Sequence, residues 1–290
     1  MITTAKKYLS LIIKGFCMGA ADIVPGVSGG TMAFILGIYE ELVDSIRLFG
    51  QKLFWNNIIH GKVHHAFLLP NWKFLLSVGS GIILAGLTLS HPLEYMLEQR
   101  PVLVWGFFFG LVSASVFVVA LRIKKWSPQL AAALIAGVLV AYVVVGLVPV
   151  TTPDAPWFLI LSGAIAICAM ILPGISGAFL LVLLGKYEFI LSAVNNRELL
   201  PIAYVGIGAV VGIIAFSQIL GWLFQRYHDI TVALLTGLMI GSLRKIWPWK
   251  IGESNVLPTI DGDTYVIMGI IAIGAVLVGM VEYISHRSRV

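Results

Sequence analysis

Apolar residues along this chain come in blocks of about 20, the length that a helix needs to cross the hydrocarbon core of a bilayer. Short segments rich in Gly, Pro or charged residues separate the blocks. Six blocks are long enough to span, at residues 73 to 91, 101 to 121, 129 to 149, 201 to 224, 229 to 246 and 264 to 284. The pattern predicts an all-α polytopic membrane protein with no sizeable soluble domain.

Two further apolar regions, 9 to 48 and 157 to 194, are each interrupted near the middle by a Gly/Pro cluster. The clusters read PGVSGG from residue 25 and PGISG from residue 173. Because proline lacks an N–H and glycine relaxes the backbone, each cluster should end one helix and begin another. Arms of about 16 to 18 residues, or about 24–27 Å, are short for a ~30 Å core. We therefore predict two re-entrant helical hairpins, whose tips must be buried in protein or face water.

The two interrupted regions are similar to each other. Aligning residues 25–40 with residues 173–188 matches eight of 16 positions at an offset of 148. The matched pairs are Pro25/Pro173, Gly26/Gly174, Ser28/Ser176, Gly29/Gly177, Leu36/Leu184, Gly37/Gly185, Tyr39/Tyr187 and Glu40/Glu188. A weaker similarity places Gly106 and Gly110 against Gly237 and Gly241. We predict two repeats, residues 1–150 and 151–290, each a re-entrant hairpin followed by three transmembrane helices.

The arrangement of the repeats fixes their relative orientation. A hairpin returns to its own side and three helices end on the other side, so the second repeat should be inverted. The side that holds the N-terminus collects thirteen Lys and Arg residues against six on the other side. By the positive-inside rule, both termini are predicted to be cytoplasmic. Lys6 and Lys7 before an apolar stretch mimic a secretory signal, but Lys14 interrupts the stretch and we expect no cleavage.

Residues 49–72 mix Trp, Phe, Lys and His and are too polar to insert, so we predict an interfacial segment along the cytoplasmic face. His60, His64 and His65 have a spacing that could bind a metal ion, but they lack Cys or carboxylate partners. No metal site is predicted there.

Composition narrows the class of protein further. With 59% apolar and 11% charged residues and a mean hydropathy of +0.97, the chain is not a water-soluble globule. The net charge of +5 is spread sparsely between apolar blocks, which does not form a nucleic-acid footprint. Cys17 and Cys168 lie inside apolar segments, so neither a disulfide nor a zinc site is predicted.

Inverted repeats with Gly/Pro breaks at corresponding positions indicate a transporter's binding site near the bilayer midplane, between the repeats. A new helix begins beyond each break, and its free N–H groups suit an anion of phosphate size. The candidate substrate-binding residues are Gly26, Ser28, Gly29, Gly30, Thr31, Gly174, Ser176 and Gly177. The alternative is that the serines are ordinary helix N-caps and the glycines serve close packing.

Charged residues supply the remaining candidates. Asp22 lies in an apolar stretch, where an ionisable group is costly, and either takes a proton or sodium ion or caps the backbone break. Glu40 and Glu188 stand twelve residues after Ser28 and Ser176, which on a helix is about 18 Å; they either gate or bind a coupling cation, or form salt bridges. Arg47 on the inner side and Arg244 with Lys245 on the outer side could hold the phosphate or act as interfacial anchors.

The segments GAADIVPGVSGGTMAFILGIYEELVDSI and ICAMILPGISGAFLLVLLGKYEFIL resemble the polyprenyl-phosphate translocases of the PopT type, over nearly the full chain. The resemblance implies a non-enzymatic flippase of the bacterial cytoplasmic membrane, a multi-pass protein without a cofactor apart from hypothetical proton or sodium coupling. It implies that the chain returns undecaprenyl phosphate, the lipid carrier of cell-wall and surface-glycan assembly, from the outer to the inner leaflet. Its partners would be that lipid and the membrane, without nucleic acid, as a monomer or homodimer.

Two other functions stay open. The motifs also look like those of undecaprenyl-pyrophosphate phosphatases, which carry a first motif like E-F-L-P-V-S-S-T-G-H and a second like P-G-T-S-R-S-G. Aligned on the prolines, Asp22 takes the Glu position and Ser28 a Ser position. Thr31 stands where the His would be and Gly177 where the Arg would be, which removes groups that phosphate-ester hydrolysis needs. The other function is an ion-coupled carrier of a small soluble anion.

Overall fold

The computed structural model describes residues 2–24, 26–121, 123, 125–252, 254–259 and 262–287. Pro25 of the first motif, and Arg122, Lys124 and Arg289 of the charge count, lie outside the described residues. The helices are α1 (Ile2–Ile23), α2 (Gly29–Ile35), α3 (Tyr39–Arg47), the 3-10 turn η1 (Leu48–Gly50), α4 (Lys52–Ile59), α5 (Val63–Leu68), α6 (Trp72–Gln99), α7 (Pro101–Ala120), α8 (Pro128–Val145), α9 (Pro156–Ile171), α10 (Gly177–Leu183), α11 (Tyr187–Asn195), α12 (Leu199–Ser242) and α13 (Gly262–Arg287). A two-stranded antiparallel ribbon, β1 (Lys250–Ile251) and β2 (Ser254–Asn255), precedes α13.

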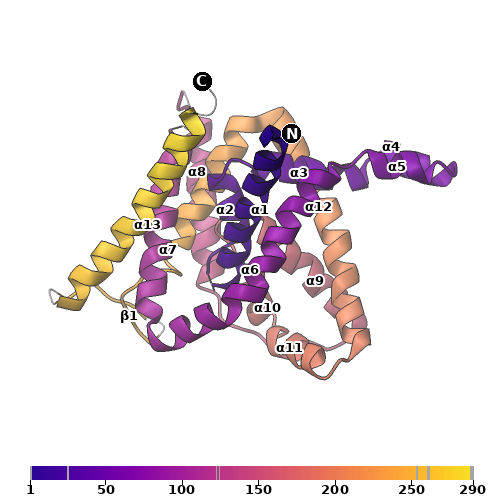
Figure 1. The fold of residues 1–290 in the computed structure, drawn as a ribbon. Helices are drawn as coiled ribbons and strands as arrows, with labels where there is room; N and C mark the ends of the chain where they lie inside the picture. Colours follow the sequence, from indigo (N-terminus) through magenta and orange to yellow (C-terminus); the bar gives the residue numbers. More distant parts are fainter. Residues whose placement is uncertain are drawn as a thin grey trace.

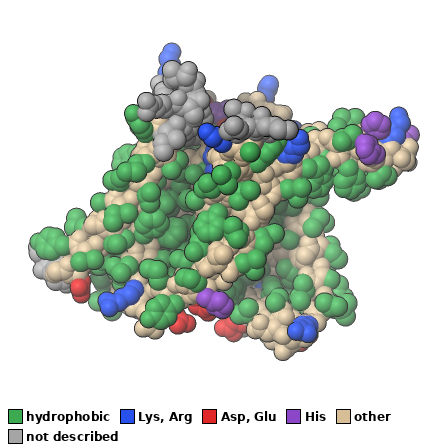
Figure 2. Space-filling view, viewed as in Figure 1, with side chains coloured by type: hydrophobic (Ala, Val, Ile, Leu, Met, Phe, Trp, Pro, Cys, Tyr) green, Lys and Arg blue, Asp and Glu red, His purple; other side chains and the backbone are tan. Residues whose placement is uncertain are grey.

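Five described helices, α6, α7, α8, α12 and α13, are long and apolar enough to cross a membrane, and six spans result if the bent pair α10 and α11 counts as one. The predicted span at 73 to 91 is longer in the structure, because α6 continues through Pro92 to Gln99. The side chains on the outside of the bundle are largely apolar, as Figure 2 shows for one face. An all-α membrane protein is therefore what the sequence folds into.

Helix α12 joins two of the predicted spans. Its 44 residues would reach about 66 Å, twice the hydrocarbon thickness, but the helix is kinked at Tyr227, which has φ −138° and ψ 48°. Arg100, between α6 and α7, has nearly the same backbone angles, φ −143° and ψ 51°. The kink thus corresponds to the boundary between α6 and α7, and we treat α12 as a first arm (residues 199–226) and a second arm (228–242).

The same elements recur in the two halves at an offset of 148 residues. Helices α1 and α9 end at Ile23 and Ile171, α2 matches α10, and α3 matches α11 residue for residue. At the breaks Gly26 and Gly174 have φ of 89° and 88°, a left-handed conformation that favours glycine. In Figure 1 the corresponding helices α3 and α11 lie at opposite ends of the molecule, α3 at the end that holds the N-terminus.

The return arm of each predicted hairpin is not one helix, which corrects the sequence-based prediction. A second break follows α2 and α10, where Gly37 and Gly185 have φ of 68° and 62°. At Gly185, in the second half, α10 and α11 are bent by 106° relative to each other. The extrapolation of about 18 Å along an unbroken helix to Glu40 and Glu188 is therefore wrong.

Glycines set the packing of the first helix of each half. Gly15 of α1 lies against the carbonyl of Val78 in α6, and Gly163 of α9 lies against that of Val205 in the first arm of α12. A Cβ at either glycine would come within 2.1 Å of that oxygen, so these helices approach backbone to backbone. Val78 and Val205 are separated by 127 residues, the same offset that separates Arg100 from Tyr227.

The remaining helices pack across the halves. Helix α7 packs on α13, and the second arm of α12 packs on α8. Gly110 contacts the carbonyl of Ile271, and Gly237 contacts that of Leu134; the two glycines are again 127 residues apart, and the two carbonyl residues are 137 apart. This register pairs Gly110 with Gly237, so the predicted pairing of Gly110 with Gly241 is wrong. Because each half supplies a partner helix to the other, the two halves interlock.

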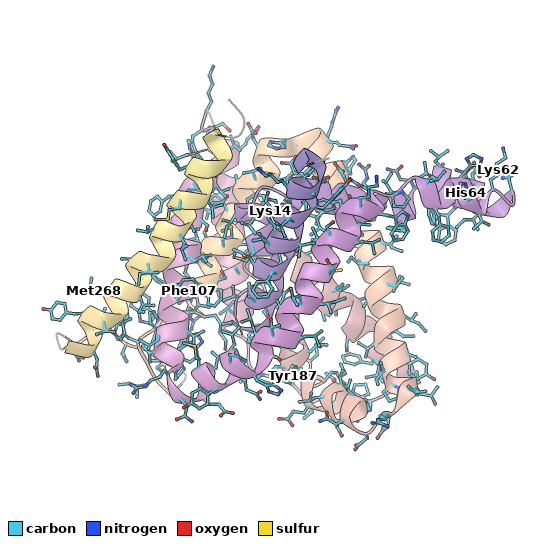
Figure 3. The ribbon with its side chains drawn as sticks, viewed as in Figure 1. Lys14, Lys62, His64, Phe107, Tyr187 and Met268 are labelled. Atoms are coloured by element: carbon cyan, nitrogen blue, oxygen red, sulfur yellow. The ribbon has the colours of Figure 1, made fainter. Side chains whose placement is uncertain are left out.

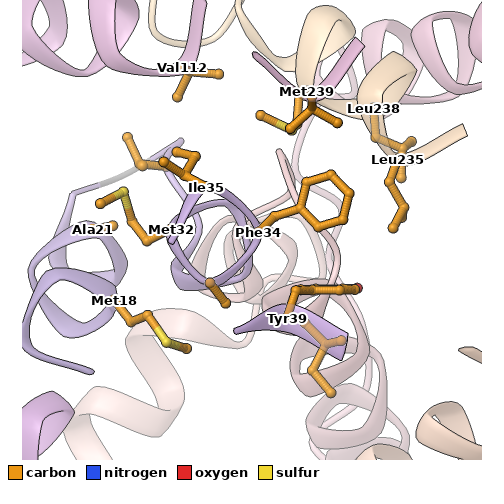
Figure 4. Close-up of a cluster of buried hydrophobic side chains, with 14 of the residues drawn as sticks. Met18, Ala21, Met32, Phe34, Ile35, Tyr39, Val112, Leu235, Leu238 and Met239 are labelled. Carbon is orange, nitrogen blue, oxygen red and sulfur yellow. The ribbon is translucent and has the colours of Figure 1, made fainter. Parts of the chain in front are cut away.

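The buried core surrounds α2, all of whose residues are buried. Side chains from α1, α2, α3, α7 and the second arm of α12 meet there (Figure 4). Tyr39 is edge-on to Phe34 and Phe224, with ring centroids 5.2 and 5.8 Å away. The segment between the two breaks of the first half is thus enclosed by helices of both halves.

Candidate functional site

The tips of the two interrupted regions contact each other. The Ser28 hydroxyl lies 3.1 Å from the carbonyl oxygens of both Met170 and Leu172 and shares its proton between them. In the other direction, the N–H of Gly174 donates to the hydroxyl oxygen of Thr31 at 2.8 Å. Gly30 lies so close to Ile171 that a Cβ would come within 2.3 Å of its carbonyl oxygen. The structure therefore brings the two tips into contact, and among the candidate residues it joins Thr31 directly to Gly174.

At the first tip the N–H groups of α2 are already satisfied. Gly29 donates to Asp22 Oδ1 at 2.7 Å, Gly30 to the Ser28 hydroxyl at 3.1 Å, and Thr31 to the Ser28 carbonyl at 2.9 Å. Asp22 and Ser28 thus cap α2, the structural alternative left open for both. A phosphate at this tip would meet the Asp22 carboxylate.

The second tip has a different electrostatic environment. Ser176 caps α10 by accepting from the N–H of Phe179 at 3.5 Å, but the position equivalent to Asp22 is Met170, so no carboxylate stands there. The ammonium of Lys245 lies 4.7 Å from the centre of the Phe179 ring. The stem of Lys245 lies against Gly26, where a Cβ would come within 2.9 Å of its Cγ. One lysine therefore touches elements of both tips.

The second arm of α12 supports this junction. Gly174 rests on its backbone and on Ser242, with a Cβ position 2.8 Å from the Leu238 carbonyl and 2.9 Å from the Ser242 hydroxyl. Gly177 is equally restricted, because a Cβ there would come within 2.4 Å of the Ala166 carbonyl. The candidate glycines at the second tip thus allow close packing, and Ser28, Thr31 and Ser176 are all buried.

Arg244 is not brought to the tips. Its guanidinium stacks 4.3 Å from the Tyr142 ring of α8 and donates to the Tyr142 carbonyl at 3.5 Å, and the residue is exposed. Of the two neighbouring basic residues, Lys245 is the one beside the hairpins. Both residues lie in the turn that follows the end of α12 at Ser242, and their side chains leave this turn in different directions.

Arg47 lies in the last turn of α3, beside a pocket of about 500 Å³. The pocket is lined by Glu41, Asp44, Ser45, Arg47, Leu48, Gln51 and Gln225. The Arg47 stem packs on Gly221 of α12, and its Nε is buried and has no hydrogen-bond partner among the described residues. Arg47 therefore belongs to a separate polar pocket, formed by α3, η1 and the end of the first arm of α12.

The two glutamates have different surroundings. Glu40 Oε1 lies 3.2 Å from His228 Nε2, and His228 Nδ1 lies 3.0 Å from Asp229 Oδ1. This cluster links α3 to the bend of α12, where His228 lies between the predicted spans 201 to 224 and 229 to 246. Glu188 is exposed in the first turn of α11. Within the described part of the chain no three His, Cys, Asp or Glu residues gather into a metal-binding group.

Lys186 is a buried charge that the sequence analysis counted only for topology. It is 2% exposed, forms an ion pair with Asp154, donates to the Thr152 carbonyl at 2.7 Å and lies between the rings of Phe158 and Phe189. These contacts of Lys186 stabilise the bend between α10 and α11. A lysine next to the repeated Tyr-Glu pair in an apolar region was a usable signal, since such a charge needs a partner.

The bend of the first half is held in a corresponding way. Lys14 Nζ, from the middle of α1 (Figure 3), donates to the carbonyl of Leu36 at 2.9 Å. The hydroxyl of Thr152 donates to the carbonyl of Leu184, the equivalent residue of the second half. In each half, a side chain therefore donates a hydrogen bond to the corresponding backbone carbonyl at the bend.

Comparisons with known proteins bear on what this arrangement does. A family described as undecaprenyl phosphate translocase-like matches residues 18–264. The chain is 44% identical to a polyprenyl-phosphate transporter of Vibrio cholerae, over 84% of this chain and 79% of the relative. It is 31% identical to a polyprenyl-phosphate transporter of Staphylococcus aureus, over 82% of this chain and 85% of the relative. No solved structure matches the chain.

Proposed function

This chain belongs to the undecaprenyl phosphate translocase-like family, and we propose that it carries undecaprenyl phosphate from the outer to the inner leaflet of a bacterial cytoplasmic membrane. The family match confirms the resemblance that the two motifs indicated. The chain is a lipid-phosphate transporter and not an enzyme. Both termini are proposed to be cytoplasmic, with the two halves inverted and their interrupted regions re-entrant.

The observation that carries the proposal is the direct hydrogen bonding between the two tips. In the closed arrangement the Ser28 hydroxyl donates to the carbonyls of Met170 and Leu172, and the N–H of Gly174 donates to the hydroxyl of Thr31. If the halves rock apart toward one face, these groups lose their partners and can bind phosphate oxygens instead. A buried polar group without a hydrogen-bond partner is costly. If these groups bond to the opposite tip in the closed state and to the phosphate in the substrate-bound state, their hydrogen bonds are made in both states.

We place the phosphate on the second tip. Lys245 supplies a positive charge there, and once the tips open Ser176 would supply a hydroxyl and the glycines Gly174 and Gly177 backbone without a side chain in the way. Without such groups, moving an anionic head through hydrocarbon would cost many kcal/mol, because a charge that leaves water loses its solvation. The prenyl tail stays in lipid, between helices.

The first tip is proposed to couple transport to an ion. Asp22 would repel an approaching phosphate, and a proton or sodium ion on its carboxylate removes that repulsion. Glu40 and Glu188 are proposed as gating residues, Glu40 through its contact with His228. Arg47 would receive the phosphate at the inner face, and Arg244 would attract it at the outer face.

The test is transport by the purified protein in proteoliposomes that contain labelled undecaprenyl phosphate. We expect the wild type to change the exposed fraction of the label between leaflets, and Ser28→Ala combined with Ser176→Ala to reduce the rate. Imposed proton and sodium gradients test coupling, and indifference to every gradient would contradict it. Release of inorganic phosphate would identify a phosphatase, and competition by small anions without need for a prenyl tail would identify a soluble-anion carrier.

A further inference from the structure

Helices α4 and α5 form an arm, residues 51–69, that extends sideways from the bundle at the end that holds the N-terminus (Figure 1). The two helices pack on each other, and α4 also packs on η1. The arm runs roughly across the direction of α6 and α13, so it lies along the plane in which a membrane surface would be found.

Aromatic side chains give the arm a fixed shape. Phe54 is buried beneath Phe49 and Phe67, with ring centroids 5.4 and 6.2 Å away. Phe67 stacks on Trp72 at 6.0 Å, and the Trp72 indole N–H donates to the Phe67 carbonyl at 2.6 Å. At the root, Gly50 of η1 lies against Gln218 of α12, where a Cβ would come within 2.4 Å of Nε2. The arm is thus packed against the bundle at its root and is not joined to it by a linker alone.

The outside of the arm remains apolar. Ile59 is 75% exposed and Leu68 is 65% exposed, and Leu53, Trp55 and Val63 are also exposed. Exposed apolar surface of this extent is unfavourable in water, roughly in proportion to its area. The apolar surface of the arm therefore requires a lipid or protein partner that shields it from water.

The charge of the arm indicates what covers it. Lys52 and Lys62 are exposed, as are His60, His64 and His65, and no Asp or Glu occurs between Asp44 and Glu94. Figure 3 places Lys62 and His64 toward the far end of the arm, and Figure 2 shows hydrophobic and basic atoms on it without an acidic one. Basic residues mixed with aromatic and aliphatic ones are typical of a segment that lies in the headgroup region of an anionic membrane.

We propose that the arm docks on the membrane surface beside the bundle and binds anionic phospholipid headgroups through Lys52 and Lys62, with its exposed apolar side chains in the headgroup boundary. This surface is distinct from the tips and does not depend on the transported substrate. Docking holds η1, and with it the pocket that contains Arg47, at the level of the headgroups.

The test uses the full-length protein in a background of Cys17→Ser and Cys168→Ser, with a single new cysteine at Ile59 or Leu68 that carries a fluorophore. Vesicles contain bromine-labelled lipid in phosphatidylcholine, with or without phosphatidylglycerol. We expect quenching by the lipid bromine to increase with phosphatidylglycerol and to fall again in high salt. Lys52→Gln with Lys62→Gln should lower the docked-to-free ratio by about fivefold for each lysine.

The matched control is Lys6→Gln with Lys7→Gln, which removes the same charge at the same end of the molecule but off the arm; quenching should stay unchanged. A label that remains open to an aqueous quencher in both lipids overturns the proposal. So does protection that follows the protein-to-lipid ratio, which would indicate a second copy of the chain as the cover. A variant that elutes as an aggregate is replaced by Lys62→Gln alone.

Discussion

The hydroxyl oxygen of Thr31 accepts a 2.8 Å hydrogen bond from the backbone N–H of Gly174, and so joins the two interrupted regions across 143 residues of sequence. Thr31 is 1% exposed, so water does not compete for this bond in the closed arrangement. Any opening of the tips has to break it. The bond is therefore a direct probe of how strongly the closed state is held.

We expect Thr31→Val to destabilise the closed protein. Valine keeps the shape of threonine but removes the acceptor, which leaves the buried N–H of Gly174 without a partner at a cost of about 1–3 kcal/mol. Thr31→Ser keeps the acceptor and should retain most of the stability. Thermal unfolding in detergent measures the difference, and equal midpoints for the valine and serine variants would contradict this role.

Substitutions of Asp22 can distinguish its role as the cap of α2 from a role in coupling transport to an ion. Asn can still accept the hydrogen bond from Gly29, so Asp22→Asn should keep the stability, whereas Asp22→Ala should lose about 1 kcal/mol. Because Asn cannot take up a proton or bind sodium through a charge, we expect Asp22→Asn to abolish the response of transport to an ion gradient. A fully gradient-dependent Asp22→Asn protein would show that Asp22 only caps α2.

Lys245 and Arg244 form a natural pair of test and control. We expect Lys245→Gln to weaken retention of undecaprenyl phosphate by roughly tenfold, since a charge-assisted hydrogen bond contributes about 1.5–3 kcal/mol. Arg244→Gln, which removes a charge from the neighbouring residue beside Tyr142, should change retention little. Equilibrium binding of the labelled lipid in detergent decides between them, and an equal effect of both variants would indicate only a general attraction to positive charge.

The contact between Glu40 and His228 should depend on pH. Hydrogen bonds to Asp229 and Glu40 raise the pKa of His228, while partial burial opposes this. The charged imidazole therefore stabilises the contact fully below about pH 6.5 and loses this effect as pH rises through the raised pKa. Because the group is half exposed, the contribution to stability should be modest.

Amide hydrogen exchange of residues 39–47 measures this contact. After correction for the intrinsic exchange rate, we expect protection to fall as pH rises above about 6.5 in the wild type and to be independent of pH in His228→Asn. His91→Asn, which alters an exposed histidine beside Glu94, is the control and should behave as the wild type. A wild-type protein without this pH dependence would contradict the proposed role of His228 in the contact with Glu40.

The second break in each half, at Gly37 and Gly185, is a feature that the sequence pattern did not predict. Gly37 and Gly185 were matched as a repeated pair, but one glycine without a proline was not interpreted as a helix end. Their left-handed φ angles end α2 and α10 after seven residues. The weak similarity paired Gly110 with Gly241 instead of Gly237, because small residues recur every turn and composition alone does not fix a register.

By itself the sequence determined the membrane class, the positions of the spans, the two tips and the repetition of their motifs. These depend on local physics: the length of an apolar run, the missing N–H of proline and the free φ of glycine act within a few residues. Only the tertiary structure decided that Thr31 bonds to Gly174, that Asp22 caps α2, that Lys245 and not Arg244 lies beside the tips, and that the halves interlock. Those relationships join residues far apart in the chain, and they follow from close backbone packing of helices at glycines, which no local pattern encodes.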